Sequence, residues 1–108
     1  MNYLYAAEKF SQARRCLMLP HTQGEHTSIM MALHECSLGL RNLNNDDIDD
    51  NAHYWIETLK GIMDVNGVDD PTGEGKWSVK ARGMTSDEKS ELSTVVDNLA
   101  NWFDHESS

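Results

Sequence analysis

The chain has 108 residues, with 18 acidic against 9 basic side chains and a net charge of −9. This length suits a single domain, 1–108, with one hydrophobic core. The negative charge argues against direct nucleic-acid binding, which depends on clustered Lys and Arg. The sequence contains no run of about 18 apolar residues, so no membrane span is predicted.

The first residues do not resemble an export signal. Glu8 and Lys9 interrupt the place where a secretory signal needs an unbroken apolar run. We therefore expect a cytoplasmic protein. Its two cysteines, Cys16 and Cys36, are too few for a disulfide scaffold, and both thiols are predicted to be free.

The first predicted helix spans residues 3–19. Phe10, Ala13 and Leu17 fall on one face at helical spacing. Pro20 then ends the pattern, because a proline inside a helix loses a hydrogen bond and clashes with the preceding turn.

The second predicted helix, residues 27–43, is the most regularly patterned segment. Its apolar residues recur at spacings of four, three, four and three, and so share one face. On this helix Ala32, Cys36 and Gly39 form a strip of small residues. A glycine inside a helix costs about 1 kcal/mol relative to alanine, so the strip predicts that a neighbouring helix comes close.

The third predicted helix, residues 46–65, repeats the same spacing and begins among aspartates, which favour the positive end of the helix dipole. Residues 66–84 are rich in glycine, show no long period and are predicted to be a loop. Within this loop the alternating residues 76–81 predict either a short extended piece laid across the bundle or a single helical turn. Thr85 and Glu88 then form a capping-box pattern that opens the fourth predicted helix, residues 85–104.

Four amphipathic helices predict an all-α protein, an up-and-down four-helix bundle with a long loop between helices three and four. A three-helix bundle whose fourth helix packs elsewhere is the alternative. The predicted core comprises Phe10, Leu17, Ile29, Leu33, Leu40, Leu43, Trp55, Leu59, Leu92, Val96, Leu99 and Phe103.

Two apolar residues lie on the opposite side of the second helix. Met31 and Leu38 are two turns apart, where a simple surface helix would carry polar residues. Large exposed apolar patches tend to mark interfaces, so we expect this side to meet a protein partner or a second copy of the chain in a homodimer.

Charge is unevenly distributed along the sequence. Residues 44–75 hold nine acidic side chains and one basic, and this acidic pole suits a basic protein partner. The later cations enclose a tryptophan, a pattern that can bind nucleotides. The simpler interpretation is that the tryptophan closes the end of the bundle and that the cations lie against the acidic residues 46–50. These two candidate groups are Asp46, Asp47, Asp49 and Asp50, and Lys76, Trp77, Lys80 and Arg82.

A metal site is the competing hypothesis. If the second and third helices were paired at their connection, His34 and Glu35 would approach His53, and helical bundles do build metal sites from facing helices. The HExxH motif is absent, however, because Leu38 occupies the position of its second histidine.

The favoured function is thus a small acidic cytoplasmic protein-interaction module, a regulator or inhibitor of a macromolecular partner. The alternative is a helical-bundle metal-binding protein or enzyme that uses His34, Glu35 and His53. The sequence contains no nucleotide-binding or catalytic motif that would predict a cofactor or name a catalytic residue.

Overall fold

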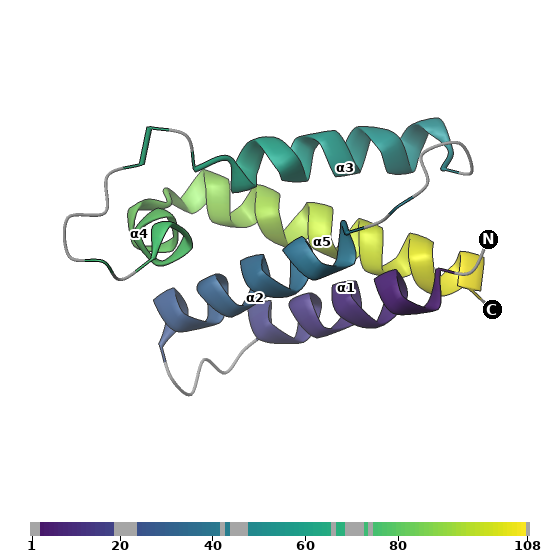
Figure 1. Cartoon of the computed structure of the whole chain (residues 1–108), viewed down its shortest axis with the longest axis horizontal. Coiled ribbons are helices and arrows are strands. Elements are labelled where there is room, and N and C mark those ends of the chain that lie inside the picture. The colour runs from purple at the N-terminus through teal and green to yellow at the C-terminus, as the bar shows by residue number, and fades with distance from the viewer. Residues whose placement is uncertain are drawn as a thin grey trace.

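A computed structural model of the chain describes residues 3–18, 24–41, 43, 48–65, 67–68, 73 and 75–107. Every regular element in these ranges is a helix (Figure 1), which confirms the predicted all-α class. The helices are α1 (Leu4–Leu17), α2 (Glu25–Gly39), α3 (Asp50–Met63), α4 (Lys76–Gly83) and α5 (Ser86–Ser107). The predicted count of four is wrong, because α4 forms inside the segment predicted to be a loop.

The four long helices run alternately in opposite directions, and α4 lies across one end of them (Figure 1). Within the described ranges, α1 packs against α2 and α5, α3 packs against α5, and α4 packs against α2. The predicted pairing of the second and third helices is therefore wrong: α2 and α3 make at most marginal contact in this part of the chain.

The core lies where α1, α2, α3 and α5 meet. Phe10 of α1 and Phe103 of α5 are fully buried and stack with their ring centroids 5.3 Å apart. Eight predicted core residues are buried, and the other four pack against the core while remaining partly exposed. Those four are Leu17, Leu40, Leu43 and Trp55.

The small strip on α2 has the predicted consequence. A Cβ atom at Gly39 would lie only 2.9 Å from Cε2 of Phe10, closer than two carbon atoms can pack. The absence of a side chain at Gly39 therefore lets the Phe10 ring reach α2, and through the Phe103 stack it links α1, α2 and α5.

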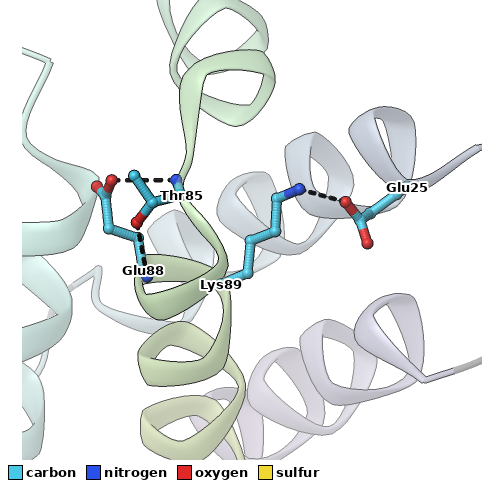
Figure 2. A network of polar contacts seen from close by, with 4 residues as sticks. All are labelled: Glu25, Thr85, Glu88 and Lys89. Carbon is cyan, nitrogen blue, oxygen red and sulfur yellow. Dashed lines mark hydrogen bonds and ion pairs between the residues drawn. The ribbon is translucent and has the colours of Figure 1, made fainter.

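Side-chain caps fix where α3 and α5 begin. Asp49 Oδ1 accepts a hydrogen bond from the Ala52 backbone N–H at 2.8 Å, so α3 begins at Asp50 rather than at residue 46. At α5, Thr85 Oγ1 accepts from the Glu88 N–H while Glu88 Oε1 accepts from the Thr85 N–H, both at 3.1 Å (Figure 2). The predicted capping box is thus confirmed.

Candidate interaction groove between α2 and α4

The short helix α4 is held against α2 by a polar contact. His26 Nε2, in the first turn of α2, lies 2.9 Å from both the carbonyl oxygen and Oγ of Ser78. A carbonyl oxygen only accepts, so Nε2 carries the proton and donates it. Ser78 is 5% exposed, and the contact satisfies a buried polar group that would otherwise destabilise the fold.

Two further contacts position α4. The Lys80 Nζ donates to the backbone carbonyl of Asp64, just after α3, at 2.6 Å. The Trp77 ring meets the His34 ring of α2 edge-on, with centroids 6.5 Å apart. Contacts with α2 and with the end of α3 therefore fix which side of α4 faces α2.

A groove of about 510 Å³ lies between α2 and α4. Its apolar surface comes from two methionines, a valine and a tryptophan, and its polar surface from a histidine, a glutamate, a lysine and the start of α4. The lining residues are Met30, Met31, His34, Glu35, Val65, Gly75, Lys76, Trp77 and Ser78.

Charge in the groove is balanced rather than of one sign. Glu35 is on the α2 side, 3.7 Å from Lys9 Nζ of α1, and its buried Oε2 accepts no hydrogen bond among the described residues. Lys76 is exposed on the α4 side. An occupant therefore meets an apolar surface with one negative and one positive side chain at opposite walls.

Both cysteines feel the charge of the groove residue Glu35, and both are poor nucleophiles. Burial, followed by the nearby Cys16 and Glu35, raises the pKa of Cys36 to about 12. Burial and Glu35 also raise the pKa of Cys16. Because the thiolate is the reactive form, neither side chain is activated, and both thiols are free in the structure.

The structure brings five of the sequence-predicted residues into the groove: Met31, His34, Glu35, Lys76 and Trp77. Met31 is 46% exposed. Leu38 is half-buried further along α2, outside the lining.

The predicted contact between the later cations and residues 46–50 is wrong for Asp49 and Asp50, the two aspartates of that range that the structure describes. The start of α3, where Asp49 and Asp50 lie, is at the opposite end of the molecule from α4 (Figure 1). Asp49 instead caps α3 and accepts a hydrogen bond from Trp102 Nε1 at 3.0 Å. Arg82 is exposed on α4. The predicted residues Asp46 and Asp47 lie outside the described residues.

The three metal candidates do not converge. His34 and Glu35 line the groove on α2, whereas His53 is exposed on α3, with Nε2 3.8 Å from a Glu57 carboxylate oxygen. Over the described ranges, no three His, Cys, Asp or Glu side chains form a group that could hold a metal ion.

Sequence reasoning missed Met30, Val65 and Ser78 in the groove, and the role of His26 beneath it. The sequence gives His26 no recognisable partner, and only the position of α4 shows that it contacts Ser78. The sequence does carry one indication of the helix α4, because Trp77, Ala81 and Met84 recur at the helical spacing of four and three residues.

Searches of protein-family models, curated proteins and solved structures give no match to this chain. Among the helices described, none combines the length and apolar character that crossing a membrane requires.

Proposed function

We propose that this chain is a small acidic cytoplasmic protein-interaction module that regulates or inhibits a macromolecular partner. The α2–α4 groove receives an apolar side chain of that partner. The observation that carries the proposal is the groove itself, in which the exposed Met31 lies beside Met30 and Trp77.

The chemistry of the lining supports a protein ligand. Methionine side chains are flexible and polarisable and adapt to different apolar partners, and tryptophan is enriched at the centres of interfaces. The volume of about 510 Å³ is ample for one or two large side chains. Glu35 and Lys76, on opposite walls, would orient the partner segment whose side chains enter the groove.

The overall charge supports a basic partner. A net charge of −9 steers cationic proteins toward the molecule and repels polyanions. A second copy of the chain is another protein that the Met31 face can receive. The metal or enzyme alternative gains no support from the geometry, because His53 does not join His34 and Glu35.

The first prediction compares two exposed methionines. Met31, 46% exposed, lines the groove, whereas Met18, 59% exposed, follows α1 outside it. In affinity capture from the native cell followed by mass spectrometry, we expect Met31→Ser to reduce recovery of the partner about tenfold, the loss typical of an interface anchor. The Met18→Ser variant should capture as much of the partner as the wild type does.

Circular dichroism must show the same helical content for both variants. Equal recovery by both would contradict the groove as the docking surface. Stoichiometric metal in the purified protein would instead favour the metal-binding alternative.

A further inference from the structure

A second groove, of about 390 Å³, runs between α3 and α5. All of its lining residues belong to these two helices, so it is distinct from the α2–α4 groove. Tyr54 and Trp55 contribute aromatic rings from α3, and Asp87 and Glu91 contribute carboxylates from α5. The remaining lining is apolar or uncharged, and no cationic side chain lines the groove.

The two carboxylates are not neutralised within the described part of the chain. Asp87 and Glu91 are exposed, and no ion pair or hydrogen bond of either is found there. They are four residues apart on one helix, so they lie one above the other, one turn apart along the groove.

The nearest cations by sequence point elsewhere. Lys89 of α5 reaches across to the carboxylate of Glu25 on α2 (Figure 2). Lys60 of α3 lies 3.9 Å from Glu57, and at about 100° per residue it is roughly 200° around the helix from the groove residue Thr58. The negative charge of the groove is therefore available to a ligand.

The aromatic residues add a second element of recognition. Tyr54 is 68% exposed, so much of its side chain is open to a partner. Trp55 beside it is partly buried and packs against the core, which holds it in place. An exposed tyrosine ring in the same groove as two carboxylates is a favourable surface for a flat cation, because the ring face attracts positive charge.

We propose that the α3–α5 groove binds the arginine side chains of a basic segment in a protein partner. The guanidinium group stacks on Tyr54 and pairs with Glu91, while a second arginine one helical turn away pairs with Asp87. Arginine suits this surface better than lysine, since its planar group both stacks on a ring and forms a two-pronged pair with a carboxylate. The inference does not depend on the occupant of the α2–α4 groove.

The test uses a defined helical peptide of alanine with two arginines four residues apart, and the same peptide with lysines. Binding is measured by calorimetry, and backbone amide chemical shifts locate the site. The key variant combines Asp87→Asn with Glu91→Gln. Its matched control combines Glu8→Gln with Glu106→Gln, two exposed glutamates outside the groove, which changes the net charge equally.

We expect the groove variant to weaken binding of the arginine peptide about fivefold, the combined effect of two partly exposed ion pairs. The control variant should weaken it less than twofold, and Tyr54→Leu and the lysine peptide should each lose about threefold. The changes in backbone amide chemical shift on peptide binding should be confined to α3 and α5. Equal losses in the groove and control variants would overturn the proposal in favour of the general field of the molecule. Equal binding of the two peptides, with no effect of Tyr54→Leu, would overturn the arginine assignment.

Discussion

Gly39 illustrates how one missing side chain shapes the contact of three helices. The ring of Phe10 occupies the space over it and stacks on Phe103. The sequence predicted the close approach, from the small strip that contains Gly39, but not the ring that fills it. Any of several apolar residues on α1 could have faced the strip, and only the packed registers of α1, α2 and α5 single out Phe10.

The second prediction concerns this site. Gly39→Ala should lower the free energy of unfolding by about 1–2 kcal/mol, because overpacking costs about 1–3 kcal/mol and exceeds the gain in helix propensity at the last residue of α2. Urea denaturation measures the change. The matched control is Gly61→Ala in α3, where a Cβ meets nothing within 4 Å. This substitution should raise the free energy of unfolding by about 0.5–1 kcal/mol. A stabilising Gly39→Ala would show that the Phe10 ring moves aside freely.

At the scale of the element, the start of α3 depends on one carboxylate. Asp49 accepts a hydrogen bond from the Ala52 N–H and another from Trp102 Nε1. These bonds, the one from Ala52 first and the one from Trp102 next, hold the pKa of Asp49 below its ordinary value. The cap therefore joins the first turn of α3 to α5 as well as satisfying a free backbone group.

The third prediction follows from this cap. Asp49→Ala should lower the free energy of unfolding by about 1 kcal/mol at neutral pH, the usual cost of losing an N-cap. Because the pKa of Asp49 is lower in the folded protein, ionised Asp49 stabilises the folded state. This stabilisation is complete above the unfolded-state pKa of about 3.9. It is lost as the pH falls through the folded-state pKa.

Asp49→Asn supplies the control, because asparagine can still cap a helix but does not titrate. The stability of the wild type relative to Asp49→Asn should therefore decline on acidification below about pH 4, in urea titrations at several pH values. A constant difference across that range would contradict the assigned cause of the pKa shift.

The four long helices were predictable because each carries a sustained apolar face. The eight-residue α4 was not predicted, because it buries only Ser78 and Ala81 and is preceded by glycine-rich sequence. Its side chains alternate in polarity over a few residues, which is equally compatible with a short strand. The groove was unpredictable for the same reason, since one of its walls is α4.

At the scale of the molecule, the predicted metal site failed because it assumed that helices adjacent in sequence are adjacent in space. In the structure α5 is the helix that packs on α3, while α2 packs on α1 and α4. Short connections favour neighbouring helices but do not require them.

The fourth prediction, self-association, separates the two kinds of partner by salt dependence. Two copies meeting through Met31 and Leu38 would form a symmetric contact, yet each carries a charge of −9. Screening of this repulsion should make the dimer tighter as ionic strength rises, whereas binding of a basic partner should weaken.

Analytical ultracentrifugation of the wild type should show a concentration-dependent dimer at high salt. The variant Met31→Glu with Leu38→Lys, if equally helical, should remain a monomer. A wild type that is monomeric at high concentration and high salt would exclude self-association and leave this face to a different protein.

The way α4 is attached has a consequence for how the groove would be lost. One wall of the groove rests on eight residues that pack on α2, with His26 and Ser78 as a polar link. Small units of this kind open locally, at a lower free energy than unfolding of the whole domain. Backbone amides of α4 should therefore exchange their hydrogens with solvent sooner than those of α1 or α5. His26→Ala would leave buried Ser78 without this partner and favour the locally open state of α4, so it should weaken binding at the groove more than it lowers the melting temperature of the whole domain.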